Sequence, residues 1–275
     1  METAPYSVLM SVYQNEKPEY LRQSLESMLR QTATPDEIVI VEDGPLTQEL
    51  YAVLDEYTEQ LGDRFQRIVN ETNLGLGVSL ARGLEHCRNE LVARMDTDDI
   101  AKPDRCAKQL ARLEADETLS VVGANIGEFI TSPEEIVAVR ALPGTHEEIC
   151  TFLKKRCPMN HMTVMFRKSA VLAAGNYLDL TYTEDYYLWV RMYLNGARFA
   201  NIPEILVYVR VGEDMYARRG GRKYYKCQCK LLKFMRKNKV ISGTQYIKAK
   251  IVRFIVQVLM PTKMRGWAYR RFARK

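Results

Sequence analysis

Residues 90–104 read ELVARMDTDDIAKPD, so a short apolar run leads directly into a cluster of three carboxylates. Residues 91–95 are typical of a buried strand, and Asp96, Asp98 and Asp99 follow it. Like charges gathered at the end of a strand are costly unless a cation or a hydroxyl-rich ligand compensates them. Carboxylate oxygens are the ligands of Mg²⁺ and Mn²⁺, and Mg²⁺ leaves positions for substrate phosphates. The same acids could also form a solvated turn before the next helix.

Upstream of this cluster, apolar runs alternate with segments of helical periodicity. We expect strands at residues 6–13, 37–41, 65–70 and 91–95, and helices at residues 19–30, 50–61 and 77–87. This alternation predicts an α/β fold with a mostly parallel central sheet flanked by helices, in which ligands bind beyond the carboxyl ends of the strands. Asp43 and the acids at 96–99 both follow such strands, which favours a binding site over a plain acidic turn.

After residue 120 the pattern is mixed. We expect strands at residues 120–124, 127–130, 136–142, 162–166 and 206–211, and helices at residues 146–155, 169–174 and 184–195. The chain is therefore expected to form one domain over residues 1–221, with two halves that meet near residue 104. A helical extension is expected over residues 222–275.

Charge is distributed unevenly along the 275 residues. Residues 222–275 contain 17 of the 40 basic residues and no acidic residue, so the first 221 residues, with 23 basic and 34 acidic residues, have a net charge of −11. The six cysteines form no CxxC pair, which favours reduced thiols over a zinc site or a disulfide framework. We expect no signal peptide and no membrane span, because no apolar run approaches about 18 residues.

The basic extension also carries apolar and aromatic side chains. A helix there would place four apolar residues on one face, namely Ile251, Phe254, Ile255 and Val258. Aromatic residues continue to the end of the chain, namely Trp267, Tyr269 and Phe272. Basic amphipathic helices with aromatic residues commonly lie in anionic membrane interfaces. Packing of these helices on the acidic body is the alternative, and nucleic-acid binding has only the basic charge in its favour.

Three other features have a functional and a structural interpretation. Glu184 and Asp185 open a helix rich in aromatic residues, where they could act in catalysis or only stabilise the helix N-terminus. His161 precedes a strand and could be a ligand or a hydrogen-bonded structural residue. Arg210 ends the last strand before a Gly- and Arg-rich segment that could be a surface loop or a lid that meets a diphosphate. At residues 75–80 the sequence GLGVSL lacks the third glycine of a dinucleotide-binding fingerprint, and no GKS or GKT is present.

Taken together, these residues resemble an inverting family 2 glycosyltransferase with the GT-A fold, of the non-processive bacterial type that assembles exopolysaccharide, capsule or lipopolysaccharide. The resemblance covers about residues 6–212. It rests on motifs in a fixed order: Ser11-Val12-Tyr13, Glu42-Asp43-Gly44, Asn73-x-Gly75, Asp96-Thr97-Asp98-Asp99 with Pro103, Asn160-His161-x-Thr163-Val164-Met165, and Glu184-Asp185-x-x-Leu188-Trp189. Glu42 departs from the family, which more often has Asp there. The QxxRW motif of processive synthases is absent.

The resemblance implies a role for each of these positions. The donor nucleotide would be bound by Val12, Tyr13, Asp43, Asn73, Asp96 and Arg210. Asp98 and Asp99 would hold Mn²⁺ or Mg²⁺. Asp185 would be the general base with Glu184 beside it, and His161 and Trp189 would contact the acceptor or a phosphate. Residues 1–104 would then be the nucleotide-sugar half and residues 105–221 the acceptor half.

The expected activity is metal-dependent, inverting transfer of a sugar from a UDP-sugar to a hydroxyl of a glycan acceptor carried on a lipid. The protein would be cytoplasmic and peripheral on the inner face of the cytoplasmic membrane, without nucleic acid as a partner. A sugar-phosphate nucleotidyltransferase is one alternative, although such enzymes usually have a Gly-rich, basic loop near the N-terminus where this chain has YSVLMSVYQNEKP. A non-catalytic membrane adaptor is the other.

Overall fold

The computed structural model describes residues 4–212, 220–261 and 264–265. In its first half, strands and helices alternate as the sequence predicts. The elements are β1 (Tyr6–Val12), α1 (Pro18–Leu29), β2 (Glu37–Asp43), α2 (Gln48–Leu61), β3 (Phe65–Asn70), α3 (Leu76–His86) and β4 (Leu91–Arg94). The strands β3, β2, β1 and β4 are neighbours in that order, and every pair among them is parallel. Their carboxyl ends therefore meet at one edge of the sheet, which is where a ligand site is expected.

The second half extends the same sheet with mixed pairing. Its elements are β5 (Ile100–Ala101), α4 (Arg105–Glu114), β6 (Leu119–Phe129), β7 (Ile136–Arg140), α5 (His146–Leu153), β8 (Met165–Arg167), α6 (Lys168–Ala173), α7 (Glu184–Leu194) and β9 (Arg198–Arg210). The strand order is β3-β2-β1-β4-β8-β6-β9-β5, and β7 pairs with β6. β8 is antiparallel to β4 and to β6, whereas β6 and β9 are parallel.

Besides β5, which the sequence does not predict, three details of this half differ from the sequence prediction. The two strands expected at 120–124 and 127–130 form one continuous strand, β6, because the pairing with β9 persists through the residues between them. The strand expected at 162–166 begins as a 3₁₀ turn over His161–Thr163, and only Met165–Arg167 pairs with the sheet. The final strand β9 begins eight residues earlier than the expected start at residue 206.

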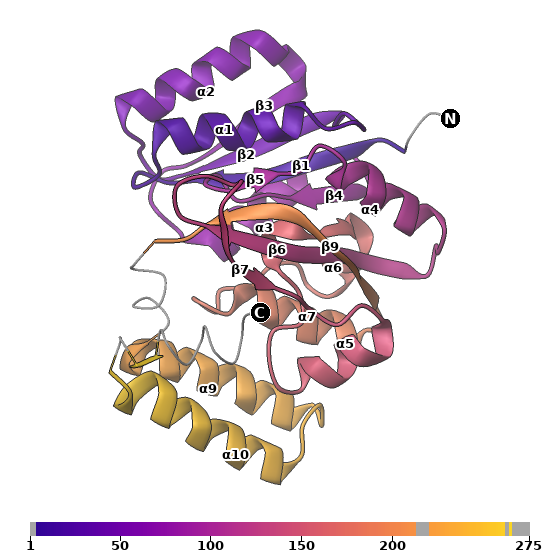
Figure 1. Cartoon of the computed structure of the whole chain (residues 1–275), viewed down its shortest axis with the longest axis vertical. Helices are drawn as coiled ribbons and strands as arrows, with labels where there is room; N and C mark the ends of the chain where they lie inside the picture. The colour runs from indigo at the N-terminus through magenta and orange to yellow at the C-terminus, as the bar shows by residue number, and fades with distance from the viewer. Residues whose placement is uncertain (1–3, 213–219, 262–263, 266–275) are drawn as a thin grey trace.

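Helices cover both faces of the sheet and enclose two apolar cores (Figure 1). The first core lies under α1, α2 and α4, and includes Leu25, Leu54 and Leu110. The second lies under α3, α5, α6 and α7, and includes Leu80 and Trp189. A sheet buried on both faces explains why its strands are near-continuous apolar runs rather than alternating ones.

The basic extension forms a pair of helices, α9 (Gly221–Lys237) and α10 (Gly243–Phe254), followed by a π-helical turn at Ile255–Leu259. Figure 1 shows the pair below α7, on the opposite side of the molecule from α1 and α2. α9 packs on the second core through Leu231, Leu232 and Met235. No residue of α10 is buried among the described residues. Of the aromatic residues near the C-terminus, Trp267, Tyr269 and Phe272 lie outside the described residues, as do residues 213–219.

Two further predictions concern redox state and membrane topology. All six cysteines are free, in agreement with the expectation of reduced thiols. Within the described ranges, no helix has the length and the apolar content needed to cross a membrane.

Candidate active site

A cleft of about 850 Å³ lies at the carboxyl ends of β1, β2 and β4. Residues from distant parts of the chain line it, because the parallel strands all end at this edge. They include Tyr13, Asp43, Asn73, Asp96, Asp98 and Arg210. Six residues that the family resemblance assigns to donor or metal binding are thus gathered in one cavity. Val12, a seventh, does not line the cleft: its side chain is fully buried in the first core, although its neighbours Ser11 and Tyr13 are both lining residues.

Asp43 organises the loop that follows β3. Its carboxylate accepts hydrogen bonds from the backbone N–H groups of Leu74 (2.7 Å) and Gly75 (3.0 Å), and its backbone carbonyl accepts one from Nδ2 of Asn73 (3.2 Å). Gly44 follows with φ of +88°, and a Cβ there would lie 2.7 Å from the backbone nitrogen of Asn73. Only glycine fits this turn, so Asp43 and Asn73 are fixed in position relative to one another.

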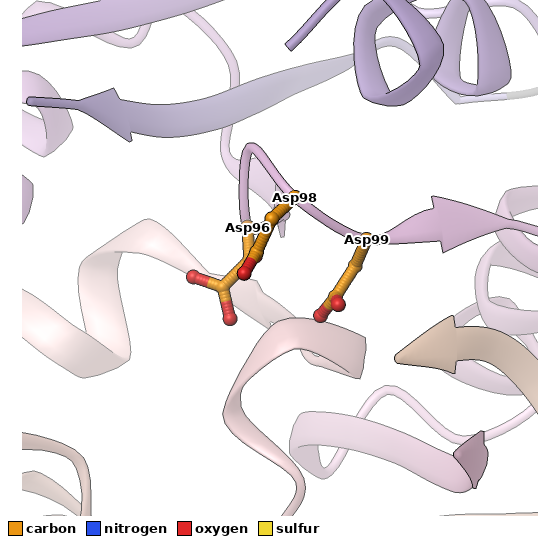
Figure 2. Close-up of side chains that lie close together, drawn as sticks. All are labelled: Asp96, Asp98 and Asp99. Atoms are coloured by element: carbon orange, nitrogen blue, oxygen red, sulfur yellow. The ribbon is translucent and has the colours of Figure 1, made fainter. Parts of the chain in front are cut away.

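The three carboxylates after β4 lie close together on the same side of the turn that carries them, as Figure 2 shows. One oxygen of each of Asp96, Asp98 and Asp99 can be chosen so that all three atoms lie within 4.8 Å of one another. The turn that carries them is held to α1 by Ser24, whose hydroxyl donates to the backbone carbonyl of Asp96 (2.7 Å). Three carboxylates at this spacing are a donor set that suits a hard divalent cation.

The electrostatics of the cluster also fit a cation. Burial raises the pKa of Asp98 to about 7, and the negative charges of Asp96 and Glu16 add to this effect. Burial and then the charges of Asp98 and Asp96 raise the pKa of Asp99 well above its usual range. Among the described residues, Oδ2 of Asp99 is buried without a hydrogen-bond partner. A bound divalent cation would give this oxygen a partner and would stabilise the charged forms of the acids.

Arg210 lies over the acid cluster from the end of β9. Its backbone N–H donates to Oδ1 of Asp99 (3.0 Å), and its Nε donates to the backbone carbonyl of Asp98 (3.3 Å). Its guanidinium carbon lies 3.8 Å from the ring centroid of Tyr20 and 4.6 Å from that of Phe129. These contacts hold a cation at the cleft, where it could meet an anionic ligand.

Glu16 is a fifth acid at this site, and the sequence analysis did not single it out. Its Oε2 accepts a hydrogen bond from the hydroxyl of Thr97 (2.5 Å), and the residue lines the cleft. The pKa of Glu16 is raised, because the effect of burial exceeds the opposite effect of the hydrogen bond from Thr97. Glu16 lies in the polar loop between β1 and α1, so its sequence context resembles an ordinary surface loop and carries no signal for this role.

The acids that open α7 lie in two different environments. Burial and the neighbouring charge of Asp185 raise the pKa of Glu184 to about 7. Asp185 accepts a hydrogen bond from the backbone N–H of Tyr186 (2.6 Å) through Oδ1, and one from the thiol of Cys157 (3.3 Å) through Oδ2. Cys157, a second residue that the sequence did not single out, thus fixes the orientation of the Asp185 carboxylate.

His161 and Trp189 are buried and do not line the cleft, and neither do Glu184 and Asp185. Nε2 of His161 is 2.9 Å from the hydroxyl of Tyr177, and its ring contacts Trp189 edge-on with 6.0 Å between centroids. Burial, and next the charge of Arg94, hold the pKa of His161 well below its ordinary value. Trp189 is fully buried, so its indole can support His161 but has no surface for an acceptor in this structure.

We expect the effect of a divalent cation on thermal stability to depend on pH. In the folded protein the carboxyl group of Asp98 has a pKa of about 7 against 3.8 in a free chain, so the native state binds more protons between these values. The raised pKa of Asp98 therefore stabilises the folded state at low pH, and this contribution to the free energy of unfolding is lost as the pH rises toward about 7. Mn²⁺ should offset this loss, because it favours the charged form.

The measurement is the shift in melting temperature on addition of Mn²⁺. The shift should be larger at pH 8 than at pH 6, and Asp98→Asn should reduce that difference. An equal shift at both pH values would contradict this account of the cluster.

The fold and the site together define a class of protein, the GT-A glycosyltransferases. The family model described as "Glycosyl transferase family 2" matches residues 7–172. The chain therefore belongs to glycosyl transferase family 2. The predicted family and fold class are confirmed.

Two relatives extend the similarity over the whole chain. The amylovoran biosynthesis glycosyltransferase AmsE of Erwinia amylovora is 40% identical over 267 residues, which are 96% of this chain and 97% of that protein. The UDP-Gal:alpha-D-GlcNAc-diphosphoundecaprenol beta-1,3-galactosyltransferase of Escherichia coli is 32% identical over 274 residues, covering 100% of this chain and 98% of that protein.

Two solved structures share the fold. TarS of S. aureus (residues 1–349), in complex with UDP-GlcNAc, has a TM-score of 0.67 at 17% identity and covers 92% of this chain and 73% of that one. The mannosyltransferase PcManGT of Pyrobaculum calidifontis, in complex with GDP-Man and Mn²⁺, has a TM-score of 0.65 at 15% identity, with 98% and 81% covered.

Proposed function

We propose that this glycosyltransferase moves a sugar from a UDP-sugar to a hydroxyl of a lipid-linked glycan, with a divalent metal ion and with inversion at the anomeric carbon. The observation that carries the proposal is the cluster of Asp96, Asp98 and Asp99, in which one oxygen of each lies within 4.8 Å of the others. Asp96 and Asp98 line the cleft, and Asp99 is buried next to them. The UDP-GlcNAc in TarS and the UDP-Gal in the name of the E. coli relative support the choice of nucleotide.

Within the cleft, each side chain has a task that its position suits. Asp43 and Asn73, fixed by the glycine turn, bind the nucleoside together with the backbone at Val12 and the ring of Tyr13. Asp96 binds the nucleotide on the side of its ribose, and Arg210 contacts the diphosphate of the same nucleotide. Asp98 and Asp99 hold Mn²⁺ or Mg²⁺, which when bound supplies positive charge to the leaving diphosphate.

The chain provides one base for the reaction. Asp185 accepts the proton of the acceptor hydroxyl as that oxygen attacks the anomeric carbon, and the bond to the diphosphate breaks on the opposite side of the ring. Glu184 lies next to this base and contributes to its environment. One displacement inverts the configuration and requires no covalent enzyme intermediate. We propose accordingly a nucleotide-sugar half at about 1–104 and an acceptor half at about 105–221, with Arg210 as a donor contact that comes from the second half.

The proposed acceptor is a glycan on a lipid diphosphate, as in the name of the E. coli relative. Such an acceptor lies at a membrane surface, and α10 offers a suitable contact. Ile247, Ile251, Val252 and Ile255 are each between 46% and 59% exposed on this helix and the turn after it, and we call this set the α10 face. Lys248 lies beside it. Apolar residues flanked by basic ones favour an anionic bilayer surface, which gives the protein a peripheral position on the inner leaflet.

We expect the double variant Ile247→Glu/Ile251→Glu to bind anionic liposomes at least about tenfold more weakly than the unaltered protein. Each isoleucine buried in lipid contributes about 1.5–3 kcal/mol, and each glutamate adds repulsion from anionic lipid. The measurement is co-sedimentation with vesicles. Val69→Glu is the matched control, because Val69 is 58% exposed on the edge strand β3, away from the extension. Equal binding of the double variant and the control to the vesicles would exclude the α10 face as the surface that contacts the membrane.

The proposed donor and metal are tested by calorimetric titration of UDP in the presence of Mn²⁺ and then of EDTA. We expect binding with Mn²⁺ and its loss with EDTA, after which transfer from UDP-sugars is measured on a lipid-diphosphate acceptor. Binding of GDP or dTDP in place of UDP would replace the proposed nucleotide. If none of UDP, GDP and dTDP binds, the chain is a non-catalytic member of its family.

A further inference from the structure

The thiol of Cys157 lies against the carboxylate of the proposed base. Cys157 is half-buried in the segment between α5 and the 3₁₀ turn at His161–Thr163. Its Sγ is 3.3 Å from Oδ2 of Asp185 and 3.5 Å from the backbone carbonyl oxygen of Met159. A thiol has one proton to donate, and a charged carboxylate is the stronger acceptor of the two. The thiol proton is therefore directed at Asp185.

The thiol is kept protonated, and the backbone that carries it is held in place. Burial, and next the negative charge of Asp185, raise the pKa of Cys157 well above its ordinary value, so the thiol remains a donor at neutral pH. Nη2 of Arg140 donates to the carbonyl of Cys157 (3.2 Å), and Nδ2 of Asn201 donates to the carbonyl of Pro158 (3.1 Å). These two bonds anchor the chain at the thiol and at the residue after it.

Each oxygen of the Asp185 carboxylate accepts one hydrogen bond, and the two donors differ in strength. Oδ1 accepts from the backbone N–H of Tyr186 (2.6 Å), whereas Oδ2 accepts from the thiol of Cys157. Donors on both oxygens fix the direction and the plane of the carboxylate. An S–H group is a weak donor, so it stabilises the negative charge on Oδ2 less than an ammonium or guanidinium group would. Oδ2 is thus held in place while it keeps most of its basicity.

We propose that Cys157 is a positioning residue, whose thiol holds the Asp185 carboxylate so that Oδ2 accepts the proton of the acceptor hydroxyl. The inference rests on the proposed function, in which Asp185 is the base. Cys157 does not line the cleft that would bind the nucleotide, so its effect should fall on the rate of transfer and not on donor binding. A residue that served only to pack the second core, against which Cys157 lies, would show no such division.

Cys157→Ala removes the donor and leaves the carboxylate free to rotate. We expect the rate of transfer at saturating donor to fall about tenfold, because a misplaced base loses part of its contribution. The affinity for UDP with Mn²⁺ should stay within about twofold of that of the unaltered protein. Cys150→Ala is the matched control, since Cys150 is another half-buried thiol but lies 3.5 Å from Nε2 of His146. The control should change neither quantity, and an unchanged transfer rate in Cys157→Ala would overturn the proposal.

Cys157→Ser separates the hydrogen bond from the packing of the side chain. A serine hydroxyl is a donor of nearly the same shape, so this variant should transfer sugar at a rate within about threefold of that of the unaltered protein. A serine variant as slow as Cys157→Ala would assign the loss to packing and overturn the proposal. A loss of UDP–Mn²⁺ affinity in parallel with the transfer rate would do the same, because it indicates a general disturbance of the site.

The infrared band of the S–H stretch tests the contact without any need for activity. The spectrum of a protein minus that of its Cys157→Ser variant isolates the band of this thiol. Asp185→Asn should move the band to higher wavenumber, because a neutral amide is a weaker acceptor than a carboxylate. A band at the same wavenumber with and without Asp185→Asn would overturn the proposal, even if Cys157→Ala does not fold. If the unaltered protein transfers no sugar, the proposed function fails by itself, and this band still decides whether the thiol holds Asp185.

Discussion

Asp98→Ala should weaken the binding of UDP in the presence of Mn²⁺ by more than about 100-fold, which places it below detection in a calorimetric titration. Asp98 is one of the three carboxylates that can meet a single cation, and it lines the cleft. Its removal leaves two carboxylates, and it also relieves their mutual repulsion, so the free protein should not lose stability.

Asp63→Ala serves as the control for this variant. Asp63 is an exposed aspartate in the 3₁₀ turn after α2, and it does not line the cleft. The melting temperature of both variants should remain within a few degrees of that of the unaltered protein. If Asp98→Ala binds UDP with Mn²⁺ as tightly as the unaltered protein, Asp98 is not a metal ligand.

Asp185→Asn should keep the affinity for UDP with Mn²⁺ and lose about 10²–10⁴-fold in the rate of transfer. General bases typically contribute this factor, and an amide has no basic oxygen at neutral pH. The substitution preserves shape, and Oδ1 can still accept the hydrogen bond from the backbone of Tyr186. The measurements are calorimetric binding of UDP and the initial rate of sugar transfer under saturating donor.

The comparison with Glu184→Gln decides which of the two acids is the base. Glu184→Gln should slow transfer less than Asp185→Asn, because its proposed contribution is indirect. The opposite order would assign the base to Glu184, and transfer at the unaltered rate in Asp185→Asn would exclude Asp185.

The first half of the fold was predictable because each of its elements carries a local signal. Apolar runs of strand length separated by amphipathic helices lead to one parallel arrangement, and the acids after β2 and β4 then meet at the same edge. β5 was missed, because two residues are too short for any periodicity. β6 was divided into two strands and β9 was expected to begin too late, because their pairing depends on contacts about 80 residues apart in sequence.

The site was predicted only where a motif marks it. Asp96, Asp98 and Asp99 were found because three acids after an apolar run are unusual. Arg94, which forms an ion pair with Asp96, was not singled out because it lies within that apolar run. Cys157 has no signal in sequence, because its hydrogen bond to Asp185 depends on how two distant segments pack.

The packing of α9 against α7 has a consequence for how the protein would meet its acceptor. Phe234 of α9 contacts the ring of Tyr187 of α7 with 4.9 Å between centroids, one helical turn from the acids Glu184 and Asp185. A bilayer that binds the α10 face would therefore fix the tilt of α7, and with it the height of the base above the lipid headgroups. Acceptors anchored in that bilayer would reach the base by a two-dimensional search at a raised effective concentration. Acceptors whose glycans are too short or too long for that height would be poor substrates.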